Sequence, residues 1–214
     1  MPFTRPFLEV RKCPGVLNFL ASASLALACC LPALPAAAQG SASAPMAGED
    51  LPVVAHLDLQ RYSGTWHEIA RLPNSFQKKC VGGDVSAQYT LLSTGEVSVV
   101  NRCRVADGSL AEAQGIARKV PPRQGEAPDV GRLQVRFAPS WLSWLPMVWG
   151  DYWVMDIADD YSTVLVGTPD RHYLWLLSRQ PTLPAAQVQE WLNKAHAQGF
   201  ATQAVTFTAA TPRP

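Results

Sequence analysis

LQRYSGTWHEIARLP, residues 59–73, is the most informative segment of the sequence. Residues 65–71 are rich in β-favouring side chains, and Pro73-Asn74-Ser75 is a turn signal. Gly64 allows the turn before the strand to approach its neighbours closely, because glycine has no Cβ. Trp66 is large enough to fill the narrow end of a small barrel. We therefore expect the first strand to start here.

Seven further short segments have residue patterns that predict β-strands. Residues 85–92 and 97–105 alternate well around Ser93-Thr94-Gly95, which is typical of a hairpin with a short loop. The other five candidates, separated by turn residues, are 111–120, 132–137, 152–157, 163–166 and 173–177. With residues 65–71 they make eight short strands at fairly regular spacing, which indicates an all-β sandwich or barrel.

The hydrophobic period changes to that of a helix near the C-terminus. Four apolar residues recur on one helical face: Val188, Trp191, Leu192 and Ala195. Thr182 is the expected N-cap, Pro184 falls in the first turn and Gly199 is the expected stop. Residues 205–207 then allow a last short strand. Eight strands followed by one amphipathic helix favour a barrel with a helix packed outside it.

Composition and charge limit the class of protein. The chain has 214 residues, of which 48% are hydrophobic, enough for one domain with a sizeable core. Its net charge is +1 and only 16% of its residues are charged. We expect no nucleic-acid partner, because binding to phosphate requires a basic excess.

The N-terminus has the pattern of an export signal over residues 1–38. Arg5, Arg11 and Lys12 precede an apolar run from 16 to 31, which prolines end, and residues 36–38 are alanines that a signal peptidase could cut after. The apolar run is shorter than the roughly 20 residues of a membrane-spanning helix. Residues 39–56 are small and poor in aromatics, so we expect a flexible linker before a folded domain at 57–210.

A second processing route is also open. Cys29 and Cys30 lie at the end of the apolar run, where a lipoprotein signal places its acylated cysteine. Either cysteine could carry a lipid, although the residues before them match that signal imperfectly. In both routes we expect an exported protein that is periplasmic or associated with the outer membrane.

Two later segments, in the right order, complete a family pattern that residues 59–73 begin. They are Trp149-Gly150-Asp151-Tyr152-Trp153-Val154 with Asp159-Asp160-Tyr161, and residues 168–179, which end in Leu176-Leu177-Ser178-Arg179. The chain resembles the lipocalin family, especially bacterial lipocalins of the outer-membrane type related to apolipoprotein D. His67, where many relatives have Tyr, and the long apolar stretch 141–148 depart from the pattern.

The resemblance implies an eight-stranded antiparallel up-and-down barrel with one C-terminal helix outside. It also implies a structural motif of Gly64, Trp66, Tyr161 and Arg179, in which the arginine packs across the indole. Such a cation–π contact stabilises by about 0.5–2 kcal/mol. The implied function is binding, storage or transport of a small apolar ligand such as a fatty acid or lysophospholipid.

The resemblance implies that Trp66 points inward, because alternation alone does not say which face of the strand is inside, and this phase selects the residues of the lumen. Alternation directs Glu68 and Ala70 inward and His67 and Ile69 outward. The expected ligand-binding residues are Glu68, Phe76, Ala87, Tyr89, Val99, Asn101, Trp149, Tyr152, Tyr173 and Trp175. A buried glutamate needs a partner, for which Tyr89, Asn101 or a ligand head group are candidates. Solvation by water in the lumen is the alternative.

Exposed apolar side chains are expected around the mouth. Phe76, in the long first loop, is expected to act as a lid, and Trp141, Trp144 and Met147 lie in a second apolar segment. Such a segment marks a ligand mouth, a membrane-surface contact or a partner surface, or it caps the core.

If Cys13, Cys29 and Cys30 leave with the signal, Cys80 and Cys103 are the cysteines that remain. An even pair in an oxidising compartment favours a disulfide, and two buried free thiols are the alternative.

Catalytic and metal-binding motifs are missing from the sequence, so we expect neither an enzyme nor a metal or cofactor site. The acidic residues Asp156, Asp159 and Asp160 are more typical of a solvated turn than of a metal site. Two functions besides the carrier stay open: an enzyme on the lipocalin scaffold that uses a free, low-pKa thiol, and an envelope interaction protein with a filled lumen.

Overall fold

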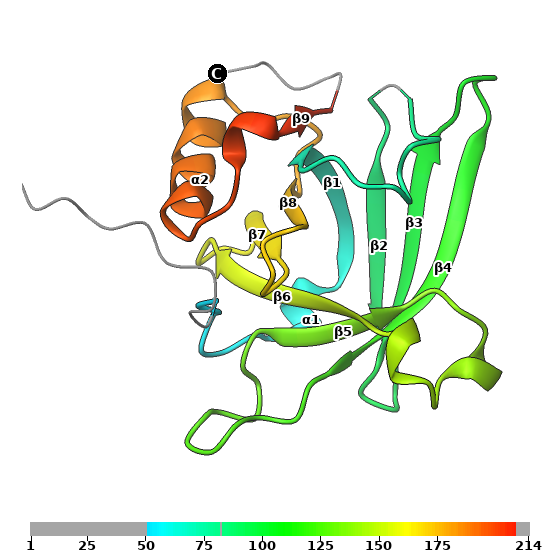
Figure 1. Cartoon of the computed structure of the whole chain (residues 1–214), viewed down its shortest axis with the longest axis vertical. Coiled ribbons are helices and arrows are strands. Elements are labelled where there is room, and N and C mark those ends of the chain that lie inside the picture. Colours follow the sequence, from blue (N-terminus) through cyan, green and yellow to red (C-terminus); the bar gives the residue numbers. More distant parts are fainter. Residues whose placement is uncertain (1–50, 82, 209–214) are drawn as a thin grey trace, which may run out of the picture. The chain divides into compact units, whose positions relative to one another are not determined.

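A computed structural model describes residues 51–81 and 83–208 and shows one closed β-barrel (Figure 1). The strands are β1 (Gly64–Arg71), β2 (Ser86–Leu91), β3 (Val97–Arg104), β4 (Leu110–Lys119), β5 (Arg132–Arg136), β6 (Gly150–Ile157), β7 (Thr163–Gly167), β8 (Leu174–Ser178) and β9 (Thr206–Phe207). The helices are α1 (Leu59–Tyr62) and α2 (Ala185–Ala197), with short 3₁₀ turns η1 (Ser140–Leu142), η2 (Pro146–Val148) and η3 (Thr202–Ala204).

Each strand from β1 to β7 pairs antiparallel with the next one in the chain, and β1 pairs with both β2 and β8. This double pairing closes the barrel, and β9 adds beside the end of β1. The eight-stranded up-and-down barrel with an outer C-terminal helix is therefore confirmed. Each expected strand is present, with its ends within two residues of the expected ones.

The topology defines two ends of the barrel. Because successive strands run in opposite directions, the connections β1–β2, β3–β4, β5–β6 and β7–β8 share one end. The connections β2–β3, β4–β5 and β6–β7 share the other end, together with α1, which leads directly into β1. Figure 1 shows the β5–β6 connection far from α2.

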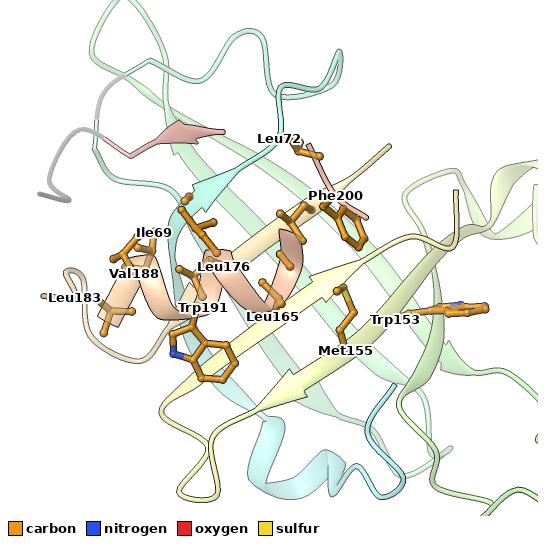
Figure 2. Close-up of a cluster of buried hydrophobic side chains, with 14 of the residues drawn as sticks. Ile69, Leu72, Trp153, Met155, Leu165, Leu176, Leu183, Val188, Trp191 and Phe200 are labelled. Carbon is orange, nitrogen blue, oxygen red and sulfur yellow. The ribbon is translucent and has the colours of Figure 1, made fainter. Parts of the chain in front are cut away.

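Helix α2 packs on the outside of the barrel wall. Its four expected apolar residues are all buried, and they join outward-facing residues of the strands, including Ile69, Leu165 and Leu176 (Figure 2). The helix ends near Gly199, whose φ of +88° suits glycine. The expectation of Thr182 as N-cap is wrong, because Pro184 occupies that position and no side chain caps the helix.

A β-bulge in β1 changes which side chains face the lumen. Glu68 pairs with Leu177, but the next pair is Ala70 with Leu176, so the register shifts at Ile69. The expected inward orientation of Ala70 is therefore wrong: Ala70 lies with Ile69 in the cluster against α2. The bulge turns the following residue, Arg71, toward the side of Glu68.

The expected linker over residues 39–56 is too long at its C-terminal end, because residues from Leu51 onward already pack on the barrel. Leu51 is buried in the cluster beneath α2, and the backbone of Val54 exchanges hydrogen bonds with Gly131 and Val154. The proposed export signal, with Cys29 and Cys30, lies outside the described residues. Within residues 51–81 and 83–208, none of the helices combines the length and apolar character needed to cross a bilayer.

Candidate functional site

Trp66 closes the barrel at the α1 end. Its side chain is fully buried, and its indole N–H donates to the carbonyl of Tyr62 at 2.8 Å. The guanidinium carbon of Arg179 lies 3.9 Å from the centre of the indole ring. Arg179 also donates to five backbone carbonyls, those of Arg61, Tyr62, Ser63, Thr65 and Tyr161. One cation therefore satisfies the carbonyls where α1 turns into β1 and covers the tryptophan.

Gly64 and Tyr161 have backbone conformations that fit this arrangement. Gly64 has a φ of +105°, and a Cβ there would lie 3.1 Å from a guanidinium nitrogen of Arg179. Glycine thus meets both a conformational and a steric requirement. Tyr161 has a φ of +59°, and its hydroxyl accepts from the backbone N–H of Asp58 at 3.0 Å. The four motif residues are thus brought together at the closed end.

Beyond Trp66 the barrel is hollow. A cavity of about 840 Å³ occupies its interior, within the usual range for small-molecule sites. All ten residues expected at a ligand site line this cavity: Glu68, Phe76, Ala87, Tyr89, Val99, Asn101, Trp149, Tyr152, Tyr173 and Trp175. Strand alternation, with the inward face taken from the family resemblance, therefore places these residues on the lumen side of the wall.

The cavity reaches solvent at the end opposite Trp66. Phe76 lines the cavity although its side chain is 62% exposed, and the lining residues Ala111 and Ala113 are also exposed. Strand β4 pairs with β5 only from Ile116 to Lys119, so its first six residues run past the end of β5. We refer to this end as the open end and to the Trp66 end as the closed end.

Three tyrosine hydroxyls meet inside the cavity. The hydroxyl of Tyr152 lies 2.6 Å from that of Tyr62 and 2.9 Å from that of Tyr89. Burial raises the pKa of Tyr89 to about 12 and raises the pKa values of Tyr62 and Tyr152 well above the ordinary value of 10.0. These hydroxyls are therefore neutral at physiological pH and can each donate or accept a hydrogen bond.

Glu68 lies nearer the open end than Trp66 does, and its carboxylate is bound by other side chains of the protein. Its carboxylate accepts hydrogen bonds from Arg71 at 2.8 Å, from Gln77 at 2.7 Å and from Thr208 at 3.3 Å. The expectation that Tyr89 or Asn101 pairs with Glu68 is therefore wrong. Sequence reasoning missed Arg71 and Gln77, because the bulge that turns Arg71 and the loop that brings Gln77 leave no periodic signal.

The β1–β2 connection covers part of the mouth through Phe76 and Gln77. Gln77 accepts from the indole N–H of Trp175 at 3.1 Å while donating to Glu68. The ring of Phe76 lies 5.5 Å from that of Tyr173 and 6.1 Å from that of Trp175. This connection is thus tied to β8 and to Tyr173 just before it by one polar contact and two aromatic contacts.

A disulfide joins the same connection to β3. Cys80 and Cys103 are bonded at 2.01 Å with their Cα atoms 5.4 Å apart, so the expected pairing is confirmed. The backbone of Val81 adds a hydrogen bond to the carbonyl of Arg104. The bond contradicts the hypothesis of an enzyme that uses either sulfur as a free thiol.

The β5–β6 connection forms the other large apolar feature at the open end. Trp149 lines the cavity, and Arg118 lies over its ring at 3.8 Å. The neighbouring Trp141, Trp144 and Met147 are not among the residues that line the cavity, and they are 72%, 75% and 85% exposed.

The acidic turn between β6 and β7 has local partners. Asp156 pairs with Lys194 at 2.9 Å, and Asp160 accepts from the backbone N–H of Ser162. In the described part of the chain, no group of three or more His, Cys, Asp or Glu residues is arranged to hold a metal ion.

A β-barrel sealed at one end by a tryptophan, hollow inside and open at the other end defines a cup-shaped class of proteins. Comparison with known proteins places the chain within that class: residues 57–210 match the family of lipocalin-like domains. The chain belongs to the lipocalin family.

Two relatives illustrate the similarity. The chain is 37% identical over 153 residues to temperature-induced lipocalin-1 of Arabidopsis thaliana, covering 71% of this chain and 78% of that protein. It is 34% identical over 159 residues to the outer membrane lipoprotein Blc of Escherichia coli K12, covering 74% and 82%. Among solved structures, insecticyanin of Manduca sexta shares the fold with a TM-score of 0.56 at 20% identity, covering 76% of this chain and 90% of that one.

Proposed function

We propose that this protein binds, stores or transports a small hydrophobic molecule in the cell envelope. The observation that carries the proposal is the cavity of about 840 Å³, which has aromatic and aliphatic walls and reaches solvent at one end. Apolar walls favour an apolar ligand because removing its surface from water contributes roughly 25 cal/mol per Å². Family membership supports the same function.

A fatty acid or lysophospholipid suits the distribution of polar groups. The deep part of the lumen is apolar except for the hydroxyls of Tyr62, Tyr89 and Tyr152. Three hydroxyls that share two hydrogen bonds leave one hydrogen to donate to an acceptor on a ligand. Near the mouth, the paired Glu68 and Arg71 provide a polar region for a head group. An acyl chain with one polar end matches this pattern.

The cell envelope is the proposed location. Residues 1–38 have the pattern of an export signal, and a relative over most of the chain is named an outer membrane lipoprotein. We propose the division into signal, linker and barrel, with the linker ending before Leu51, and with cleavage after Ala38 or lipid attachment at Cys29 or Cys30 as the two processing routes. Identification of the mature N-terminus by mass spectrometry distinguishes them.

Binding rather than catalysis is the proposed activity. The disulfide removes Cys80 and Cys103 as nucleophiles, and the lumen glutamate is held by an arginine and a glutamine. A filled lumen, which the envelope interaction protein requires, is inconsistent with a cavity of this volume.

Native mass spectrometry of the exported protein, purified without denaturant, tests the proposal. We expect a co-purified apolar compound of about one molecule per chain, or stoichiometric uptake of an added fatty acid. Trp175→Ala should weaken that uptake, because Trp175 lines the cavity. If no apolar compound binds and Trp175→Ala changes nothing, the carrier function is wrong.

A further inference from the structure

The exposed large hydrophobic side chains of the described residues all lie at the open end. They belong to three of its connections or to the strand ends beside them: Phe76, Val81, Leu110, Phe137, Trp141, Trp144 and Met147. We call these seven residues the apolar rim. None of the exposed large hydrophobics in residues 51–81 and 83–208 lies on α2 or at the closed end. Exposed apolar side chains gathered on one end of a barrel mark a contact surface.

We propose that the apolar rim docks on a lipid bilayer and seats the mouth of the barrel on the membrane surface. The contact is made by the folded domain itself and needs no lipid attached to the N-terminus. It has the geometry of interfacial contact, in which side chains enter the boundary between head groups and acyl chains.

The β5–β6 connection supplies the most exposed part of the rim. From Phe137 to Trp149 the sequence contains no charged residue, so this segment has no charge with which to pair with a protein partner. Trp141, Trp144 and Met147 are 72%, 75% and 85% exposed. Tryptophan is the side chain that favours the membrane–water interface, since its ring is apolar and its N–H can reach the head groups.

The same connection is held in shape from within. Backbone hydrogen bonds close η1 and η2, including Ser143 to Ser140 and Trp149 to Pro146. The indole N–H of Trp149 donates to the carbonyl of Ser143 at 2.8 Å. The exposed tryptophans are therefore presented by an ordered turn, which lowers the conformational entropy lost on docking.

Charge on the opposite side of the mouth favours phospholipid over a second copy of this chain. Lys78 and Lys79 follow Phe76 in the β1–β2 connection, and within the described residues neither makes an ion pair. Arg102 and Arg104 nearby are already paired, with Glu112 and Asp84. The two lysines are thus available to phosphate groups, each attracted to a strongly anionic surface by about fivefold in binding constant.

The placement has a consequence for ligand exchange, and this step rests on the proposed carrier function. Because Phe76 and Phe137 belong to the rim and also line the cavity, the apolar surface is continuous from the rim into the lumen. An acyl chain leaving the bilayer then enters the barrel without crossing water. The docking itself does not depend on a bound ligand.

Vesicle flotation tests the docking. The exported full chain carrying Cys29→Ser and Cys30→Ser, which cannot be acylated there, is mixed with phosphatidylethanolamine–phosphatidylglycerol vesicles. We expect it to float with the vesicles and its tryptophan fluorescence to be quenched by brominated acyl chains. In that background, W141S/W144S/M147S should weaken binding at least tenfold. The control Q187S/H196S/A197S, on the exposed face of α2, should leave binding unchanged.

Each other outcome is informative. Equal flotation of the rim variant and the control overturns the proposal, and so does a parent chain that does not float with the vesicles. A dimer of the parent chain that the rim substitutions dissociate, without vesicle binding, assigns the rim to a second copy and also overturns it. Trp175→Ala should float normally while its ligand uptake falls, which supports both the docking and the carrier function. Flotation of the parent chain without any ligand uptake contradicts the carrier function but supports the docking.

Discussion

The two ends of the barrel differ in how they use aromatic side chains. At the closed end, Trp66 is fully buried, its N–H is bonded and Arg179 covers its ring. At the open end, Trp141 and Trp144 are more than two-thirds exposed. The same residue type stabilises the fold at one end and offers a surface at the other. Burial and hydrogen bonding, rather than residue type, separate the structural part of the molecule from the functional part.

Trp66→Ala is the substitution with the largest expected effect. Removing a fully buried indole leaves a void beside Arg179, and we expect a loss of about 3–5 kcal/mol in the free energy of unfolding. Trp175→Ala, at a partly buried lumen position near the mouth, should cost clearly less. Chemical denaturation of both variants measures the difference. Equal losses in the free energy of unfolding for the two variants would contradict the view that the closed end contributes more to stability than the open end.

The disulfide at the open end has the next largest expected effect. Cys80 and Cys103 are separated by 23 positions, and in the loop-entropy picture such a link contributes about 3 kcal/mol. C80A/C103A should therefore lower the free energy of unfolding by about this amount. The barrel should remain closed, because β2 and β3 pair without the disulfide. Loss of the native circular-dichroism spectrum would contradict this expectation.

Arg179→Lys tests whether the closed end depends on charge or on geometry. Lysine keeps the cation but cannot donate to five carbonyls in a planar arrangement. We expect a loss of about 2 kcal/mol in the free energy of unfolding, because several carbonyls lose their donor. Arg118 lies over the ring of Trp149 at the open end, so Arg118→Lys is the matched cation–π control. It should change the free energy of unfolding by less than about 1 kcal/mol. A neutral Arg179→Lys would show that the charge alone is sufficient.

High pH should affect the lumen without a substitution. Burial raises the pKa of Tyr89 from 10.0 to about 12, so the folded state binds its proton more tightly than the unfolded state does. The resulting stability is fully present below pH 10 and is lost as pH rises toward 12. Titration of phenolate absorbance should show tyrosines that ionise late in the folded protein and near the ordinary pKa in denaturant. Identical titrations in the two states would contradict the buried hydroxyl cluster.

Strand alternation predicted most of the site from the sequence. The family resemblance places Trp66 inward, the period of two then assigns Tyr89, Val99, Asn101 and Trp175 to the lumen, and all four line the cavity. Ala70 was misplaced because a one-residue bulge at Ile69 reverses the phase, and the composition of β1 gives no sign of it. Alternation is reliable only as far as the next irregularity in a strand.

Contacts made by loops could not be predicted in the same way. The partners of Glu68 come from Arg71 beyond the bulge, from Gln77 in the β1–β2 connection and from Thr208 near the C-terminus. Their approach is set by the tertiary fold and has no periodic signal in the sequence. The predicted N-cap of α2 was also wrong: Pro184, with its fixed φ, is the N-cap, and the helix begins at Ala185, three residues after Thr182.

The central claim is that the hollow half of the barrel is the binding volume, and two substitutions on neighbouring residues of β4 test it most directly. Ala113 lines the cavity, and the adjacent Gln114 lies on the opposite face of the strand. Titration with a fluorescent fatty-acid analogue should show that Ala113→Trp weakens binding at least tenfold, whereas Gln114→Trp binds like the unmodified protein. Equal affinities for the two variants would contradict the claim.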